Sequence, residues 1–148
     1  MTDVWFYHLE HTSLEQALPE LLDKTLARGW KALVRATERA RLDQLDGWLW
    51  TYRDEAFLPH GLNDEPYADR QPVLLTTEFG NPNGAEALFL VDGAEAGDLA
   101  PYVRCMVLFD GRDEGIVAAA RAQWSRIKAT GAEMSYWRQE GRGWRKQS

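Results

Sequence analysis

The chain has 148 residues, of which 45% are hydrophobic and 27% are charged, a composition typical of a globular protein. Its single cysteine, Cys105, excludes an internal disulfide and a multi-cysteine zinc site. The formal net charge of -6 is unevenly divided, because the last 28 residues carry +5 and the rest carry -11. An acidic body disfavours general binding to a nucleic-acid backbone, whereas the basic C-terminal part favours a short acidic partner.

The length is that of one domain, so we expect a single domain over residues 1–148 with a C-terminal tail from about residue 139. No apolar run approaches the ~20 residues that a membrane-spanning helix needs. The N-terminal residues do not have the pattern of a signal peptide. We therefore expect a cytoplasmic protein without a membrane contact.

In chain order, residues 4–9 predict a buried first strand because they are aromatic and β-branched. Ser13 and Gln16 form a capping box before a helical apolar stripe that ends at Gly29, with Pro19 as a local conflict inside it. Residues 31–36 predict a second strand, and a second helix follows through Trp50.

A long polar loop is predicted at residues 51–71. Strands are then predicted at 72–77, 87–91 and 104–109, a last helix at 113–130, and a short edge strand at 133–138. Strands that alternate with helices predict the α/β class: a three-layer, Rossmann-like, mostly parallel sheet with helices on both faces.

The strand ends show no phosphate-binding loop and no nucleophile motif, so no cofactor is expected. An alternative is a Mg²⁺-dependent nuclease or phosphatase that uses the carboxylates of Asp92, Asp110 and Asp113. The competing interpretation is a turn at residues 110–113, with Asp113 as the N-cap of the last helix. We favour the second interpretation, without a metal site.

Two stripes of side chains run along the last helix, one apolar and one that combines apolar and basic residues. Ile116, Ala120, Gln123 and Ile127 form the natural core face. The adjacent stripe consists of Val117, Arg121, Trp124 and Lys128, which places an indole between two cations. Such a surface suits a peptide that ends in an apolar ring and a carboxylate, with Arg121 pairing the carboxylate. The alternative makes Trp124 a core-edge residue and the two cations solubilising groups.

Aromatic side chains also crowd residues 47–61, namely Trp48, Trp50, Tyr52 and Phe57, before a Pro59-His60-Gly61 stop. Rings at a helix end and in the following loop either fill a core or anchor another protein. We interpret this segment as partly an exposed anchor, and His60 as a loop histidine whose ring is satisfied by the backbone.

Three stretches together resemble the chi subunit family of bacterial DNA polymerase III, in its alphaproteobacterial form. They are V-W-F-Y-H-L near the start, L-W-T-Y-R-D-E-A-F-L-P-H in the middle, and A-A-A-R-A-Q-W-S-R-I-K-A-T-G near the end. The resemblance implies a non-catalytic accessory subunit of the clamp-loader assembly. Such a subunit bridges the psi subunit to the acidic C-terminal tail of single-stranded DNA-binding protein, so nucleic acid is contacted only indirectly.

By the same resemblance, the tail-binding surface includes Arg121 and Trp124, with Val117 and Lys128 beside them. The family's usual lysine one turn before the arginine is Val117 here, and the basic residue after the aromatic is Ser125. Lys128, Arg126 or Arg112 are the candidates to compensate. The psi-facing surface, which related proteins also use for a helicase, is matched by residues Trp50, Phe57, Pro59 and His60. A third hypothesis is direct single-strand binding through the tryptophans and the basic tail.

Overall fold

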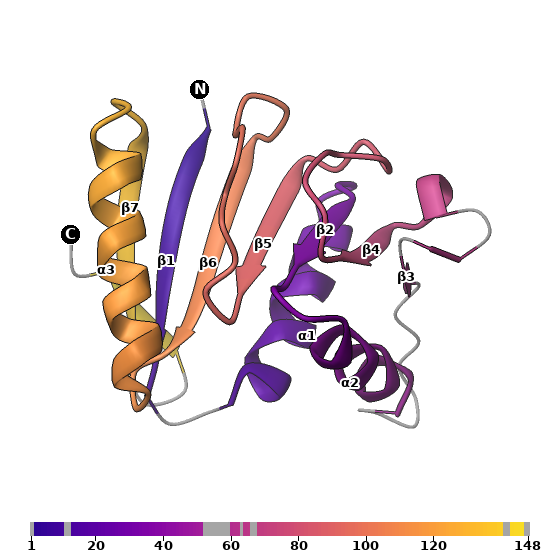
Figure 1. The fold of residues 1–148 in the computed structure, drawn as a ribbon, viewed down its shortest axis with the longest axis horizontal. Coiled ribbons are helices and arrows are strands. Elements are labelled where there is room, and N and C mark those ends of the chain that lie inside the picture. The colour runs from indigo at the N-terminus through magenta and orange to yellow at the C-terminus, as the bar shows by residue number, and fades with distance from the viewer. Residues whose placement is uncertain are drawn as a thin grey trace.

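The computed structural model describes residues 2–10, 13–51, 60–62, 64–65, 68–140 and 143–146. Within these ranges eight strands form one sheet (Figure 1). The strands are β1 (Asp3–Leu9), β2 (Ala32–Arg35), β3 (His60–Leu62), β4 (Val73–Thr76), β5 (Ala87–Val91), β6 (Arg104–Asp110), β7 (Glu133–Glu140) and β8 (Gly143–Lys146). The helices are α1 (Leu14–Ala27), α2 (Arg39–Thr51) and α3 (Glu114–Lys128), with a short 3-10 helix η1 (Ala68–Arg70).

The sheet order is β3-β4-β2-β5-β6-β1-β7-β8. Every neighbouring pair is parallel except β7 and β8, which are antiparallel. Strands β2, β4 and β5 are buried along their whole length, as expected for parallel strands covered on both faces. The predicted α/β class with a mostly parallel sheet is therefore confirmed.

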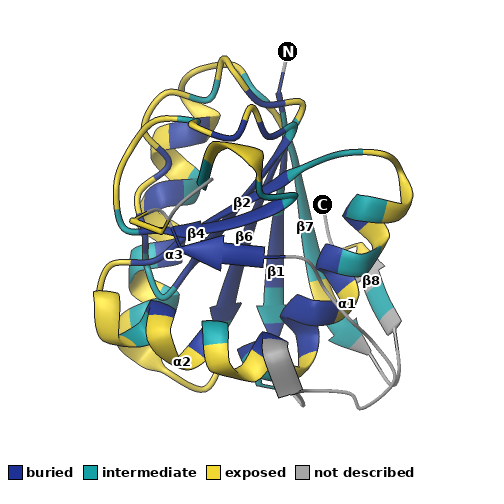
Figure 2. Ribbon diagram, turned by 90° about the vertical axis from the view of Figure 1, so that its right-hand side faces the viewer, coloured by how far each residue is buried: buried dark blue, intermediate teal, exposed yellow. Residues whose placement is uncertain are grey.

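Two apolar clusters, one on each face of the sheet, make up the core. Leucines of α1 and α2 pack with Tyr7, Val34 and Phe89 on one face. On the other face, Ala120 and Ile127 of α3 pack with Phe6 and Val107, and the segment 94–102 completes the cover. Figure 2 shows the strands buried between helices whose outer surfaces are exposed. The sheet thus separates two surfaces, one beside α1 and one beside α3.

Helix α1 keeps Pro19 in its interior and still runs without a break. Gln16 accepts a hydrogen bond from the Ser13 backbone N–H at 3.0 Å, as the predicted capping box requires. Pro19 has no N–H to donate to the carbonyl of Glu15 one turn earlier. The indole N–H of Trp48 on α2 donates to that carbonyl instead. A hydrogen bond between helices therefore replaces the one that proline removes within the helix.

Three predictions about the chain need correction. The predicted loop at 51–71 contains β3, which pairs with β4. The predicted edge strand is β7, which lies inside the sheet between β1 and β8. The expected tail from about residue 139 instead continues β7 and turns back as β8, where Trp144 packs on Tyr7 with ring centroids 4.8 Å apart. Backbone pairing and ring burial together explain why this part of the chain is ordered into the sheet.

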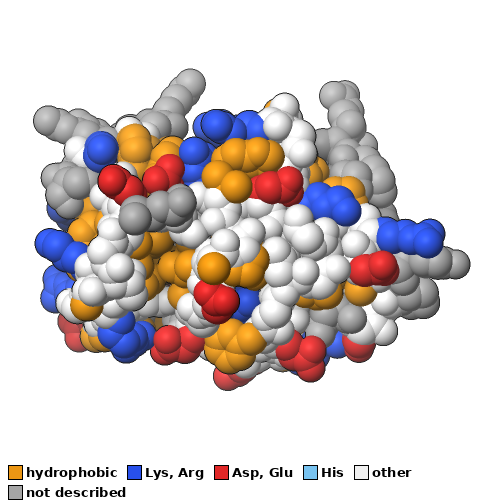
Figure 3. Space-filling model, turned by 90° about the horizontal axis from the view of Figure 1, so that it is seen from above, with side chains coloured by type: hydrophobic (Ala, Val, Ile, Leu, Met, Phe, Trp, Pro, Cys, Tyr) orange, Lys and Arg blue, Asp and Glu red, His pale blue; other side chains and the backbone are white. Residues whose placement is uncertain are grey.

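Figure 3 looks from above onto the end of the molecule where the N-terminus lies. Hydrophobic side chains form patches on this surface, and Lys and Arg side chains lie directly beside some of them. Among the described helices, none is long and apolar enough to cross a membrane.

Candidate functional site

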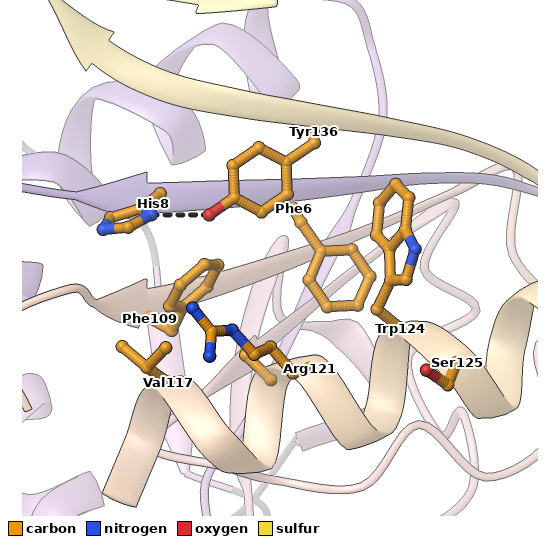
Figure 4. Close-up of a pocket in the computed structure, with 9 residues that line it drawn as sticks. Phe6, His8, Phe109, Val117, Arg121, Trp124, Ser125 and Tyr136 are labelled. Carbon is orange, nitrogen blue, oxygen red and sulfur yellow. Dashed lines mark hydrogen bonds between the residues drawn. The ribbon is translucent and has the colours of Figure 1, made fainter. Parts of the chain in front are cut away.

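A pocket of about 370 Å³ opens between α3 and the β6-β1-β7 part of the sheet (Figure 4). Its walls are mostly apolar and aromatic, and its polar groups sit near the rim. The lining residues are Phe6, His8, Phe109, Val117, Ala120, Arg121, Trp124, Ser125 and Tyr136. Concave apolar surfaces with a few convergent polar groups are the usual form of ligand sites.

Strand register brings the sheet side of the pocket together. In the parallel ladders Phe6 of β1 lies level with Tyr136 of β7, and His8 lies level with Phe109 of β6. Residues two apart on β1 point to the same face, so Phe6 and His8 both face α3. Three strands that are distant in sequence thereby supply one aromatic floor.

Helix α3 supplies the opposite wall. Val117, Arg121 and Trp124 recur at i, i+4 and i+7 and so lie on one stripe of the helix. Asp113 caps the helix by accepting a hydrogen bond from the Ile116 backbone N–H at 3.2 Å, and Gly131 follows the helix with φ +83°. The core stripe predicted beside it is confirmed, because Ala120, Gln123 and Ile127 are buried.

Trp124 is half-buried at one end of the pocket. Its ring meets Phe6 edge-to-face with centroids 5.1 Å apart, and it meets Tyr136 in the same manner at 5.9 Å. Edge-to-face pairs at these distances hold aromatic rings in place beyond simple area burial. The indole is therefore a fixed wall of the pocket with part of its surface still open.

Arg121 is exposed and makes no hydrogen bond or ion pair with any residue that the structure describes. In Figure 4 its guanidinium leans over the pocket, between Val117 and the ring of Phe109. Other arginines nearby are engaged: Arg126 pairs with Glu95 at 3.1 Å, and Arg112 pairs with Asp110 at 3.0 Å. Arg121 is thus a cation at the pocket rim that is available to an incoming anion.

His8 closes the other end of the pocket. Its Nδ1 shares a hydrogen bond with the Tyr136 hydroxyl at 2.5 Å (Figure 4). Burial lowers the pKa of His8; Glu10 and Asp110 oppose this effect, while Arg138 and Arg121 add to it. A neutral imidazole at this position leaves Arg121 as the fixed positive charge of the pocket.

Gly111 lets the His8 ring take this position. A Cβ at Gly111 would lie 1.9 Å from His8 Nε2, which is far inside van der Waals contact. The glycine is therefore required by close approach of the ring to the backbone. Any larger residue would push His8 out of the pocket end.

The structure brings together three of the four residues predicted on the α3 stripe. Val117, Arg121 and Trp124 line the pocket, whereas Lys128 is exposed and lies outside it. Ser125 is at the rim. Sequence reasoning missed the sheet side, Phe6, Phe109 and Tyr136, because only the strand order shows that these rings meet. The available signal was an aromatic residue in each of three predicted strands.

The second predicted surface is only partly within the described residues. Phe57, Pro59 and the side chain of Trp50 lie outside them. The side chain of His60 is 0% exposed, and its Nε2 lies 3.1 Å from Asp46 Oδ1 on α2. His60 is therefore a buried residue of β3 and not the loop residue that we expected, although its Nε2 also lies 3.2 Å from the Asp46 backbone carbonyl, in line with a ring satisfied by the backbone.

The three carboxylates of the alternative catalytic site are all held by structural partners. Asp92 pairs with Arg41 at 2.7 Å, Asp110 pairs with Arg112, and Asp113 caps α3. These three carboxylates line one small pocket. Within the described ranges, however, no group of three or more His, Cys, Asp or Glu side chains could hold a metal ion. Each carboxylate instead has a structural partner.

Comparison with known proteins identifies the family of this chain. Residues 1–135 match the family described as DNA polymerase III chi subunit, HolC. The chain is 31% identical over 85 residues to the probable DNA polymerase III subunit chi of Rickettsia prowazekii (strain Madrid E), covering 57% of this chain and 52% of that relative. It is 34% identical over 95 residues to the DNA polymerase III subunit chi of Pseudomonas aeruginosa, covering 62% of this chain and 64% of that relative.

The aligned parts thus span between about half and just under two thirds of these curated relatives. The family match is broader, because it runs from the first residue through the first three residues of β7. It includes every residue of the α3 stripe and all but one residue of the aromatic floor. Because the family match covers residues 1–135, the chain belongs to the DNA polymerase III chi subunit family.

Proposed function

We propose that the protein is a non-catalytic cytoplasmic adaptor of the replicative polymerase. One surface would bind the acidic C-terminal tail of single-stranded DNA-binding protein, and a second would bind the psi subunit or a helicase. Family membership supports a role within the polymerase assembly. The pocket beside α3 supports the first contact.

The observation that carries the proposal is an unpaired guanidinium above an aromatic pocket. A peptide that ends in an apolar ring offers two matching groups at once, the ring and the terminal carboxylate. The ring enters between Phe6, Phe109 and Trp124, and Arg121 pairs the carboxylate. Arg–carboxylate pairs of this kind are strong and directional because two N–H groups face two oxygens.

The ring and the carboxylate together account for part of the binding free energy of a micromolar complex. Burial of one aromatic ring contributes ~2–3 kcal/mol, and a hydrogen bond to a charged group contributes ~1.5–3 kcal/mol. A micromolar complex needs ~8 kcal/mol in total, so further contacts upstream of the terminus are required. Lys128 is exposed one turn beyond Trp124, where it is placed to meet acidic residues upstream in the tail.

Two departures from the family pattern, Val117 and Ser125, shape this proposal. Val117 stands where a lysine is usual, so one cation is absent from the rim and an apolar wall takes its place. Arg126 and Arg112 do not fill that role here, because Glu95 and Asp110 already pair with them. We therefore expect a tail contact that depends more on ring burial and less on salt than a lysine-bearing pocket would.

For the second surface, the proposal rests on the residues 47–61 as a sequence. Trp50, Phe57 and Pro59 match the family's psi-facing motif. His60 matches as well, but its buried side chain contacts Asp46 of α2, so we expect it to position β3 and not to contact a partner directly. The two surfaces would then lie on different elements, as a bridging role requires.

The test is calorimetry with a peptide that carries the acidic tail and its free carboxyl end. Arg121→Ala should weaken binding by about tenfold or more, the loss of one charge-assisted interaction. Arg126→Ala removes the same residue type from the same helix but from a position paired with Glu95, so it serves as the matched control. Equal affinities for the two variants would remove Arg121 from the site.

A further inference from the structure

A second pocket lies on the opposite face of the sheet, between α1 and the strands β6, β1 and β7. Its volume is about 230 Å³. Aromatic rings and basic side chains supply most of its lining, and no Asp or Glu is among the described residues that line it. The pocket beside α3 has one cation at its rim, whereas this one has three: Lys24, Arg28 and Arg104.

Arg104 is the centre of this pocket. Its guanidinium lies over the ring of Trp5 at 3.9 Å and over that of Trp30 at 5.2 Å. Its Nε is buried without a hydrogen-bond partner, and no ion pair to Arg104 occurs within the described ranges. The guanidinium of Arg28 lies over the same Trp30 ring at 4.6 Å. Two like charges thus share one indole without a carboxylate between them.

The electrostatics of this arrangement favour the binding of an anion. Burial and the neighbouring Arg28 lower the pKa of Arg104, and Tyr7 and Asp3 only partly oppose them. Arg104 is half-buried, and its Nε is the atom that lacks a hydrogen-bond partner, so an anion that approaches this side of the guanidinium would stabilise it. Cation–π contacts with Trp5 and Trp30 offset part of this cost. An anionic ligand in the pocket would offset the rest.

The indole N–H and the aromatic rings of the pocket indicate which class of anionic ligand it can bind. The indole N–H of Trp137 is buried and unpaired, so it offers a donor and no acceptor. Trp137 and Trp144 are half-buried rings on the wall of the pocket. The site therefore provides flat π-faces, hydrogen-bond donors and positive charges together. Its complement is a flat ring that carries acceptor oxygens and is attached to negative groups.

We propose that this pocket binds a nucleotide unit of a single-stranded nucleic acid. The base stacks on the indole wall formed by Trp137 and Trp144, and the phosphates meet Lys24, Arg28 and Arg104. Base–aromatic stacking together with a basic groove is the usual physical basis of single-strand binding. An acidic peptide without a ring would satisfy the cations but would leave the ring faces unused, whereas each nucleotide unit offers both a flat base and a phosphate, so the nucleotide is the better match. The contact is direct and does not depend on the tail-binding pocket.

The experiment measures fluorescence anisotropy of a labelled oligothymidylate with the whole protein. The wild type should bind at low salt, with an affinity that falls as salt rises. Lys24→Glu with Arg28→Glu should weaken binding by about tenfold or more, because two phosphate contacts become repulsive. Competition with dTMP and with inorganic phosphate shows whether the base contributes, and dTMP should compete better.

The matched control is Lys128→Glu with Arg126→Glu. Both pairs consist of one lysine and one arginine, all four are exposed, and both pairs lie at the last turn of a helix or its C-cap. The control should retain oligonucleotide binding and should instead weaken binding of the tail peptide. Loss of binding at one pocket should therefore leave binding at the other pocket intact. Urea unfolding of each variant verifies that the fold is intact.

Three results would overturn this assignment. The wild type fails to bind the oligonucleotide at low salt, the two double variants lose binding equally, or inorganic phosphate competes as well as dTMP. An acidic peptide that binds in place of the oligonucleotide, with the same dependence on Lys24 and Arg28, would assign the pocket to a protein partner and refute the nucleotide.

Discussion

Replacing Trp48 by phenylalanine removes one interhelical hydrogen bond and keeps most of the ring. The indole N–H donates to the Glu15 carbonyl, which has no i+4 donor because residue 19 is proline. Trp48 is 37% exposed, so the phenylalanine loses little buried area. The main effect of the substitution is therefore the loss of the hydrogen bond to the Glu15 carbonyl, which proline leaves without a partner in the helix.

The expected loss is about 1 kcal/mol. A neutral hydrogen bond contributes ~0.5–1.5 kcal/mol, and a carbonyl left unpaired in a buried place costs ~1–3 kcal/mol. Glu15 is half-buried, so water can reach part of this region and the low end applies. For a chain of this size such a loss lowers Tm by about 2–4 °C.

The assay is urea unfolding of a double-mutant cycle with Pro19→Ala. Alanine at position 19 supplies the missing N–H, so the Glu15 carbonyl regains its partner within the helix. In that background Trp48→Phe should cost little, giving a coupling of about 1 kcal/mol between the two sites. The stability of Pro19→Ala alone is measured as the baseline of that background, and its sign does not affect the test, since only the coupling is compared. An equal cost of Trp48→Phe in both backgrounds would refute the reasoning.

Three further predictions concern the pocket end, the C-terminal strand and the second surface. The folded protein lowers the pKa of His8, so the unfolded chain takes up a proton first and stability should fall as pH drops through about 6.5. Urea midpoints should show a weaker pH dependence in His8→Gln, and an unchanged dependence would assign it to other groups. Trp144→Ala should cost about 2 kcal/mol in urea unfolding, since half of a buried tryptophan's contribution is lost; no loss would mean that β8 is only a tail. Phe57→Ala should abolish pull-down of psi or of a helicase with an unchanged melting curve, whereas cooperative unfolding would make Phe57 a core residue.

Most of the fold could be predicted from local pattern. Continuous apolar runs gave β2, β4, β5 and β6 to within one residue at each end, and capping signals gave the start of α1 and α3. The two strands that were missed have little pattern of their own. Strand β3 is H-G-L, and β8 is G-W-R-K. Their structure comes from pairing with β4 and β7, so non-local hydrogen bonds and not propensity decide it.

The candidate site divides in the same way. Helical spacing alone placed Val117, Arg121 and Trp124 on one stripe, because a helix has a fixed period. The facing rings required the order β6-β1-β7, which no local pattern contains. Lys128 shares the stripe but lies beyond the pocket, since a straight stripe extends farther than the concave surface that it borders.

The pocket beside α1 went unrecognised for a related reason. Its tryptophans and arginines come from α1, β1, β6, β7 and β8, and each looks unremarkable within its own element. The last of these elements was expected to be a tail. Only the assembled sheet shows that basic and aromatic side chains gather there, with no carboxylate among the described residues that line the pocket.

The central claim is that Arg121 pairs the terminal carboxylate of an acidic tail whose last ring enters the aromatic pocket. Calorimetry with two forms of the tail peptide, one with a free carboxyl end and one amidated, tests this pairing in the wild type and in Arg121→Ala. Amidation should weaken binding to the wild type by about tenfold and should have little further effect on the variant. If amidation weakens binding equally in both proteins, the carboxylate does not meet Arg121 and the claim is wrong.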